Sequence, residues 1–421
     1  MRVQRNYNRP FFSNRRRGLG IRSIFFVGLF LGAVLVLFAL QYDRIQIAAL
    51  DAVGFAPTPT PLPSNIAMQG SVLFVEGDVQ AAAQLFGQAM QQQPDNADYL
   101  YEYGTILIEM NMVDEAVPIA EQMIAVAPED PRGYALKART LMWDAPAEAI
   151  QAAILGIDID PNFAPLYAAS GVAYTNLGRW QEGLREGARA IEIDPMDRFS
   201  LFAYQFPLTY VGRYQEAIDY LEQSIALNPN LAEPYFYLAR LYTLPGVDNP
   251  EMAIATYFRI LEMEPDNAKA NLRLCETFAG VDEADFREAQ PYCDEAIRLD
   301  PTYASAYRQR GQMQYNRRNY EGAIESFERC IALGSEEIEC YYLRGLAHYW
   351  LGGEDCPAAW DVLQDSRTRA QAQGEAESVL NAIQIGLGNI QANCSGYANV
   401  SVPTVPPPTS IPPTPIGGGY G

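Results

Sequence analysis

Six cysteines are the side chains with the most distinctive chemistry in this 421-residue chain, and all lie in its C-terminal half. Zinc fingers and thioredoxin-like redox sites need closely spaced pairs such as C-x-x-C, and no two of these cysteines have that spacing. An even number of cysteines outside the cytoplasm suggests disulfides. The alternative is buried free thiols, because cysteine is often a small core residue. The six are Cys275, Cys293, Cys330, Cys340, Cys356 and Cys394.

The other side chains on which catalysis usually depends do not form a recognisable active site. The chain has one histidine, His348, so it contains no H-E-x-x-H metal site, and the G-x-S-x-G elbow of serine hydrolases is absent. Its two lysines, Lys137 and Lys269, are each followed by alanine, which rules out a phosphate-binding G-x-x-x-x-G-K-[ST] loop. We therefore expect no enzyme activity, no cofactor and no metal, and we interpret His348 as structural.

The middle of the chain is organised by helical periodicity. Tyr167, Gly171 and Tyr174 share one helix face at i, i+4 and i+7. Gly178 is placed to end that helix, and a second helical pattern runs to Pro195. Neither helix can bury its apolar face alone, so the hairpin must stack on copies of itself. Prolines end equivalent helices every 33 to 36 residues, at Pro94, Pro128, Pro161, Pro195, Pro229, Pro265 and Pro301.

This pattern resembles the tetratricopeptide repeat. Tyr167, Gly171, Tyr174, Gly178, Ala190 and Pro195 fall on the positions of that family's pattern, and small residues recur in register in the other repeats. Departures are Gly183 for the usual alanine, Gln205 for the usual glycine and Ser335 for the closing proline. The resemblance implies an all-α fold: a right-handed α-solenoid of about nine helix hairpins over residues 64–374.

The repeat pattern also implies how the cysteines pair. Cys275 takes the small position of a first helix and Cys293 an apolar position of the second helix in the same hairpin. Cys330 ends one repeat and Cys340 begins the next, so their helices are neighbours. The remaining pair, Cys356 and Cys394, would tie the last repeat to the segment that follows it.

The family resemblance implies that the first helix of each repeat lines a concave groove. Aromatic and arginine side chains there are typical of protein-binding hot spots. The alternative is that the rings fill gaps between neighbouring helices. The lysine–asparagine clamp that some family members use for C-terminal carboxylates is not reproduced. The residues mapped to the groove are Phe202, Phe206, Tyr210, Phe236, Arg240, Arg308, Tyr315, Asn316, Tyr342, Tyr349 and Trp350.

The N-terminus has the composition of a membrane anchor. Residues 1–22 hold seven arginines and no acidic residue, and residues 23–40 are uncharged and apolar. A cleaved signal peptide and a buried core helix are alternatives, but we expect a retained transmembrane helix with the arginines in the cytoplasm and the repeats outside. Residues 41–63 form a proline-rich linker, for which we expect semi-rigid polyproline II structure.

After the repeats, residues 375–394 have helical spacing, and we expect them to cap the last apolar face. Residues 395–421 contain seven prolines and a Gly-Gly-Gly run, and we expect a disordered tail rich in proline, threonine and glycine. The chain has 30 basic residues; without the seven N-terminal arginines, 23 remain against 51 acidic ones, a net charge of −28 for residues 23–421. Such a charge argues against nucleic acid as a partner.

These features favour one function over two alternatives. The leading hypothesis is a membrane-anchored extracytoplasmic scaffold that binds a protein or an extended peptide in its concave groove. The first alternative is a structural spacer of the cell envelope, in which the proline-rich ends carry the role. The second is an accessory factor that binds or processes carbohydrate, since aromatic grooves also suit sugars.

Overall fold

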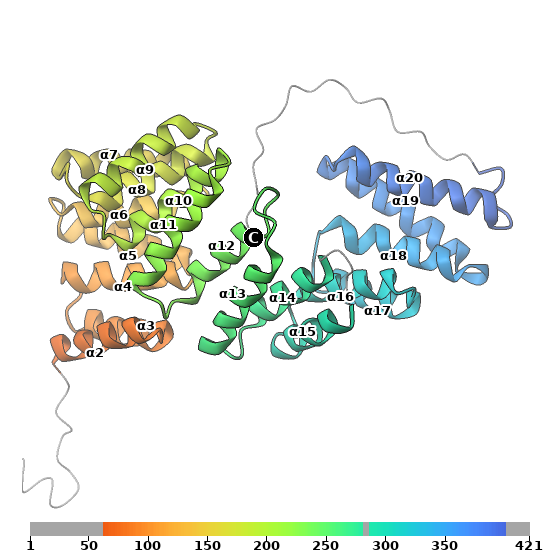
Figure 1. Ribbon diagram of the computed structural model, residues 1–421, viewed down its shortest axis with the longest axis horizontal. Coiled ribbons are helices and arrows are strands. Elements are labelled where there is room, and N and C mark those ends of the chain that lie inside the picture. The colour runs from red at the N-terminus through yellow and green to blue at the C-terminus, as the bar shows by residue number, and fades with distance from the viewer. Residues whose placement is uncertain (1–61, 281–285, 401–421) are drawn as a thin grey trace, which may run out of the picture. The chain divides into compact units, whose positions relative to one another are not determined.

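The computed structural model describes residues 62–280 and 286–400, and within these ranges the chain is a solenoid of 19 α-helices with no β-strand. Consecutive helices form nine antiparallel hairpins, and a last helix follows them (Figure 1). We call the first five hairpins the first half. Its helices are α2 (Pro63–Glu76), α3 (Val79–Gln92), α4 (Ala97–Glu109), α5 (Val113–Val126), α6 (Pro131–Leu141), α7 (Pro146–Ile159), α8 (Ala164–Asn176), α9 (Trp180–Ile193), α10 (Arg198–Tyr210) and α11 (Tyr214–Leu227).

The second half comprises the other four hairpins and the last helix, α20, which packs on α19 and α18. A 3₁₀ turn at Gly353–Asp355 joins α18 to α19. The helices are α12 (Ala232–Tyr242), α13 (Pro250–Met263), α14 (Ala268–Gly280), α15 (Phe286–Leu299), α16 (Ala304–Asn316), α17 (Tyr320–Ala332), α18 (Ile338–Leu351), α19 (Cys356–Gln373) and α20 (Glu377–Asn393).

Several predicted segments lie outside the described residues. These are the arginine-rich segment 1–22, the predicted transmembrane helix 23–40, nearly all of the linker and the tail from residue 401 onward. Within the described ranges, every helix is too short or too polar to span a bilayer.

The hairpin of α8 and α9 shows how small residues bring two helices together. Gly171 in α8 faces Gly187 and Gly183 in α9, and a Cβ atom on Gly171 would lie 3.1 Å from the Gly187 nitrogen. Gly178 ends the first helix with φ +73°, a left-handed conformation that glycine adopts without steric cost. The missing side chains let the backbones approach closely, so the small positions predicted from the repeat mark the helix crossing.

A tyrosine near the start of several first helices secures the turn that precedes the helix. The Tyr167 hydroxyl donates a hydrogen bond to the Pro161 carbonyl oxygen six residues earlier, at 3.0 Å. Three other repeats have the same bond, from Tyr235, Tyr307 and Tyr341. In the last of these the acceptor is the carbonyl of Ser335, at 3.0 Å. Because the bond uses a backbone oxygen, it survives the loss of the closing proline at that position.

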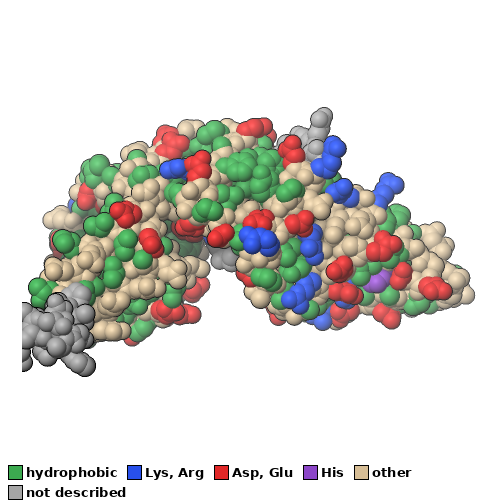
Figure 2. All heavy atoms as spheres, turned by 90° about the horizontal axis from the view of Figure 1, so that it is seen from below, with side chains coloured by type: hydrophobic (Ala, Val, Ile, Leu, Met, Phe, Trp, Pro, Cys, Tyr) green, Lys and Arg blue, Asp and Glu red, His purple; other side chains and the backbone are tan. Residues whose placement is uncertain are grey.

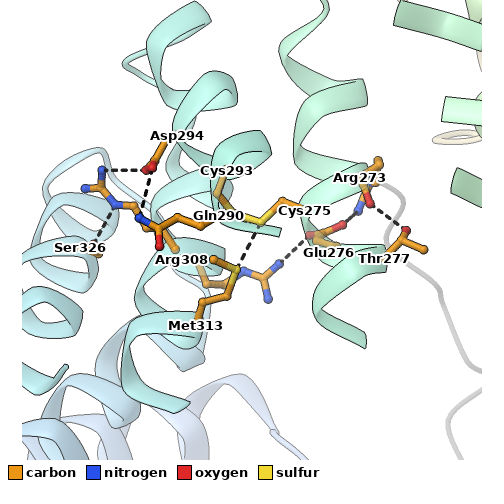
Figure 3. The surroundings of a disulfide bond; sticks show 11 residues. Arg273, Cys275, Glu276, Thr277, Gln290, Cys293, Asp294, Arg308, Met313 and Ser326 are labelled. Atoms are coloured by element: carbon orange, nitrogen blue, oxygen red, sulfur yellow. Dashed lines mark hydrogen bonds and ion pairs between the residues drawn. A yellow bond between two sulfur atoms is a disulfide. The ribbon is translucent and has the colours of Figure 1, made fainter. Parts of the chain in front are cut away.

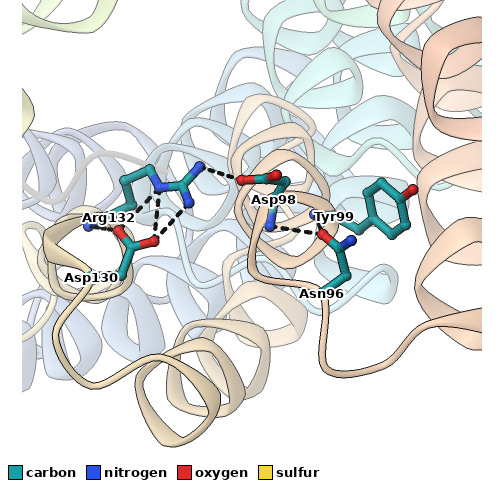
Figure 4. Close-up of polar contacts among 5 residues, drawn as sticks. All are labelled: Asn96, Asp98, Tyr99, Asp130 and Arg132. Carbon is teal, nitrogen blue, oxygen red and sulfur yellow. Dashed lines mark hydrogen bonds and ion pairs between the residues drawn. The ribbon is translucent and has the colours of Figure 1, made fainter. Parts of the chain in front are cut away.

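Caps and ion pairs fix how one repeat follows another (Figure 4). The Asn96 side chain accepts hydrogen bonds from two backbone N–H groups of α4, and Asp130 does the same for one in α6. The Arg132 guanidinium binds the cap residue Asp130 at 2.7 Å and reaches Asp98 in the preceding repeat at 2.8 Å. One arginine therefore links the starts of two successive first helices.

The six cysteines lie at disulfide distance in the three predicted pairs. Cys275 and Cys293 join α14 to α15, with sulfur atoms 2.00 Å apart (Figure 3). Cys330 and Cys340 join α17 to α18, at 2.10 Å. Cys356, which begins α19, lies 2.01 Å from Cys394, which follows α20. All three links fall in the second half. The described residues of the first half contain no such link.

Gly183→Ala tests the helix crossing, because it restores the residue usual in the repeat. The new methyl group would lie 2.9 Å from the Gly171 carbonyl oxygen and would clash with the Thr175 hydroxyl. That hydroxyl already donates to the same carbonyl at 2.8 Å. Overpacking costs ~1–3 kcal/mol, against a helix-propensity gain of ~1 kcal/mol.

We expect Gly183→Ala to lower the free energy of unfolding measured in urea. The matched control is Gly388→Ala in open space on α20, which should stabilise the protein; equal stabilisation by both would contradict the close crossing.

The disulfide prediction concerns protein isolated from its native compartment. Non-reducing peptide mapping should find three cross-linked peptides, one for each pair described above. Each bond should contribute ~2–4 kcal/mol by restricting the unfolded chain, so reduction should lower the midpoint of chemical unfolding. Six alkylatable thiols in the native protein would contradict this prediction.

Candidate functional site

The first half closes on itself between its first repeat and the turn after its fifth. The Asn230 side-chain amide donates to the Val75 carbonyl oxygen at 2.9 Å, and the Asn228 amide donates to the Phe74 carbonyl oxygen at 3.4 Å. These bonds join the C-terminal end of α2 to the segment between α11 and α12. The five hairpins therefore complete a turn whose two ends are in contact.

The inner side of this turn is filled by a buried ion cluster. The Glu109 carboxylate binds the guanidinium groups of Arg198 at 2.5 Å and Arg139 at 3.2 Å, and the Glu109 and Arg139 side chains are only 12% and 4% exposed. The Arg139 guanidinium also lies 4.2 Å from the centre of the Phe199 ring. Burial alone would raise the pKa of Glu109, but the two guanidinium groups outweigh it and hold that pKa below its ordinary value.

Two of the predicted groove aromatics, Phe202 and Phe206 of α10, fill gaps between neighbouring helices, including α12 of the second half. The Phe206 ring packs edge-on against Trp143, with centroids 4.8 Å apart, and against Phe202 and Tyr237 at 5.5 and 5.3 Å. Both phenylalanines are half-buried by these contacts. For Phe202 and Phe206, the gap-filling alternative therefore accounts for most of the ring surface.

Three further predicted residues come from the end of the first half and the start of the second. Phe236 is 8% exposed and packs against Tyr257 in the core between α12 and α13, so its ring lies inside the hairpin and not on its surface. Tyr210 is 56% exposed at the end of α10, and Arg240 is exposed near the end of α12.

A polar hollow of about 260 Å³ lies between α14, the start of α15 and α16 in the second half. The Arg308 guanidinium lies at its edge and pairs with Glu276 at 3.5 Å and with Glu337. Gln312 and the exposed Asn316 complete the polar lining. This hollow brings together two of the predicted groove residues, Arg308 and Asn316.

Four aromatic rings gather at the C-terminal end of α18, and we call them the α18 aromatic patch: Tyr315, Tyr320, Tyr349 and Trp350. Trp350 is 53% exposed, and its indole N–H donates to the Tyr315 hydroxyl at 3.0 Å. Its ring stacks on Tyr320, with centroids 6.3 Å apart, and contacts Tyr349 at 5.1 Å. The neighbouring Tyr342 is half-buried, and burial raises the pKa of its hydroxyl.

The sequence predicted three of the four residues in this patch. Tyr320 was missed because it begins a second helix, whereas the groove prediction considered first helices only. Asn393, at the end of α20, was also missed; its amide donates to the Tyr349 hydroxyl at 2.9 Å. An aromatic residue directly after the turn between two helices is the signal that could have identified Tyr320.

The described residues contain no cluster of three or more histidine, cysteine or carboxylate side chains able to hold a metal ion. His348 is mostly buried, with its Nδ1 atom 3.5 Å from a carboxylate oxygen of Asp355. On the face drawn in Figure 2, acidic side chains are spread widely, whereas basic ones gather over the second half. This face of the second half therefore carries both signs of charge.

Comparison with known proteins identifies the repeats. Residues 73–140, 208–235 and 281–338 match models of the tetratricopeptide repeat, so the chain contains repeats of this kind. The structure also aligns with one chain of the crystal structure of the APC/C hetero-tetramer Cut9-Hcn1, over 83% of this chain and 82% of that one, with a TM-score of 0.51 and 13% identity. At that identity the likeness shows the fold alone, an all-helical solenoid.

Curated relatives match parts of the chain. The mitochondrial import receptor subunit TOM70 of Homo sapiens is 26% identical over 206 residues, 46% of this chain and 32% of that protein. A DnaJ homolog subfamily C member 7 homolog of Dictyostelium discoideum is 25% identical over 151 residues, which are 33% of this chain and 28% of that protein. The human protein O-mannosyl-transferase TMTC3 is 23% identical over 233 residues, which are 54% of this chain and 25% of that protein. The chain spans about a third or less of the length of these relatives.

Glu109→Ala tests the ion cluster. It would leave two guanidinium groups buried without their carboxylate, and breaking a buried pair costs ~3–5 kcal/mol. We expect a loss of that size in the free energy of unfolding. Glu192→Ala is the control, because Glu192 pairs with Arg189 on the surface, where such pairs contribute less than ~1 kcal/mol. Equal effects of the two substitutions would contradict the cluster.

The depressed pKa of Glu109 also predicts a pH dependence. A carboxyl group with a lower pKa in the folded state stabilises the fold above its unfolded pKa, which is about 4.3, and loses that contribution as the pH falls through the folded value. Unfolding midpoints measured between pH 7 and pH 3 should therefore fall more steeply for the unmodified chain than for Glu109→Gln. Parallel curves would contradict the assignment.

Proposed function

We propose that this protein is a membrane-anchored scaffold whose second half binds another protein or an extended peptide. The observation that carries this proposal is the contrast between the two halves. The first half fills its inner side with its own Glu109, Arg139 and Phe199, whereas the second half exposes the α18 aromatic patch and a polar hollow. Tryptophan, tyrosine and arginine are the side chains that dominate protein-binding energies, and the patch holds the first two while the hollow holds Arg308.

The repeats support the same conclusion at the level of fold. Tetratricopeptide repeats present extended surfaces without supplying catalytic groups, which suits a protein-binding role. The names of two relatives describe one as an import receptor subunit and the other as a DnaJ homologue, whereas the third is named as a transferase and is matched over 25% of its length. We therefore propose a non-enzymatic role, with the partner recognised through apolar and hydrogen-bonding contacts.

The proposed membrane location depends on sequence features. Seven arginines precede the apolar segment 23–40, and the bias of positive charge toward the cytoplasm would place the repeats on the other side. Three cysteine pairs at disulfide distance are consistent with a compartment that is not reducing. The linker 41–63 would then separate the solenoid from the membrane.

Binding should be concentrated in few side chains. Once a partner is purified, Trp350→Ala in the full chain should weaken its Kd by about 30-fold, which corresponds to ~2 kcal/mol, with an unchanged helical circular dichroism signal. Trp180→Ala is the matched control, because Trp180 is a partly exposed tryptophan on α9 in the closed half. Phe327→Ala should instead unfold neighbouring repeats, since its ring is fully buried against Gly311. If Trp350→Ala binds normally, recognition lies elsewhere and the spacer role is favoured.

Topology is tested separately. Protease added to intact cells that express the full chain should remove the repeats, and the purified protein should retain its N-terminal arginines. Complete protection of the repeats, or a mature N-terminus after Leu40, would contradict a retained anchor with external repeats.

A further inference from the structure

The α18 aromatic patch has the chemistry of a surface that is normally covered. Trp350 is 53% exposed although it stacks on Tyr320 and contacts Tyr349, and the three tyrosines around it are half-buried. None of the four side chains is charged. An exposed tryptophan surrounded by partly buried tyrosines marks a candidate interaction site. Because the Trp350 N–H already donates to Tyr315, the tyrosine hydroxyls are the donors left for an occupant, which should present apolar rings and hydrogen-bond acceptors.

The C-terminal end of the solenoid is fixed beside this patch. Asn393, the last residue of α20, donates a hydrogen bond to the Tyr349 hydroxyl at 2.9 Å. Cys394 lies at disulfide distance from Cys356, five residues after the end of α18. Tyr397 packs on Trp360, with ring centroids 5.1 Å apart, and the Val400 carbonyl oxygen accepts from the Gln391 amide at 2.9 Å. The chain therefore leaves the described structure beside the C-terminal turn of α20, the helix whose last residue contacts Tyr349 of the patch.

The sequence that begins there has the matching chemistry. Residues 401–416 read SVPTVPPPTSIPPTPI, with seven prolines and no charged side chain. Proline lacks an N–H group, so such a segment presents carbonyl acceptors and apolar pyrrolidine rings. Proline-rich segments favour the extended polyproline II helix, and aromatic grooves recognise that helix because little conformational entropy is lost on binding.

We propose that the α18 aromatic patch binds a neutral, proline-rich segment in extended conformation, and that residues 403–415 of the same chain are its resident occupant. This inference rests on the proposed function, because it names the class of segment that the exposed patch recognises. An external partner with a proline-rich segment would then compete with the tail, so the tail would set the threshold for partner binding.

The length of the tail and its effective concentration favour binding of the patch by the chain's own tail. The first proline, Pro403, is three residues beyond the last described residue, and thirteen residues of polyproline II extend about 40 Å. A short tether gives an effective concentration on the order of 1 mM. A segment whose separate Kd is ~0.1 mM would therefore occupy the patch about nine-tenths of the time when it is attached.

The test compares the full chain with a variant that ends at Val400, both purified in the same detergent. The probe is a fluorescein-labelled peptide of residues 401–416, and its binding is measured by fluorescence anisotropy. We expect saturable binding to the shortened chain and at least tenfold weaker binding to the full chain, because the attached tail competes. Equal binding to both chains would overturn occupation by the chain's own tail.

Controls separate the patch from other surfaces. In the shortened chain, Trp350→Ala should weaken peptide binding at least tenfold with an unchanged circular dichroism spectrum, while Trp180→Ala should have no effect. A peptide with alanine in place of Pro406, Pro407 and Pro408 should bind more weakly. The proposal fails if the shortened chain does not bind the peptide, or if a neutral oligosaccharide binds the patch instead. If the peptide fails but a protein partner binds with dependence on Trp350, the scaffold function stands and only the proline-rich occupant is wrong.

Discussion

The solenoid depends on the close crossing of the two helices in each hairpin. In the first and eighth hairpins, a glycine of the first helix faces a phenylalanine ring of the second. A Cβ atom on Gly70 would meet the Phe86 ring at 2.8 Å, and one on Gly311 would meet the Phe327 ring at 2.7 Å. Each hairpin buries only part of its apolar surface this way and covers the rest with its neighbours. The stability of each repeat therefore depends on its interfaces with the repeats before and after it.

The side chains at the inner side of the solenoid determine what each half can bind. In repeat four the helix crossing is built from glycine alone, and the first half closes with its first repeat bonded to the turn after its fifth. In that half, Glu109 pairs with Arg139 and Arg198. In the second half, three cysteine pairs lie at disulfide distance between helices, and Trp350 remains exposed at the end of α18. The cross-links and the exposed tryptophan thus occur in the same half.

The sequence predicted the helix hairpins and the cysteine pairs because both follow from a repeat of fixed length. It did not predict the contact between Glu109 and Arg198, which are 89 residues apart, because that contact depends on curvature summed over several repeats. Repeat position alone did not reveal that Phe236 packs against Tyr257 within its own hairpin. Tyr320 was not predicted because the groove prediction considered first helices only, whereas Tyr320 begins the second helix of its hairpin. The role of the N-terminal anchor remains a sequence prediction, since residues 1–61 lie outside the described ranges.

The central claim is that the α18 aromatic patch is a binding surface for extended, proline-rich peptide. The most direct measurement places a photo-reactive phenylalanine analogue at Tyr320 in the full chain and maps the cross-linked peptides by mass spectrometry. The account predicts cross-links to residues 403–415, or to a proline-rich segment of a partner that displaces them. Cross-links confined to the neighbouring helices α16, α17 and α18 would contradict it.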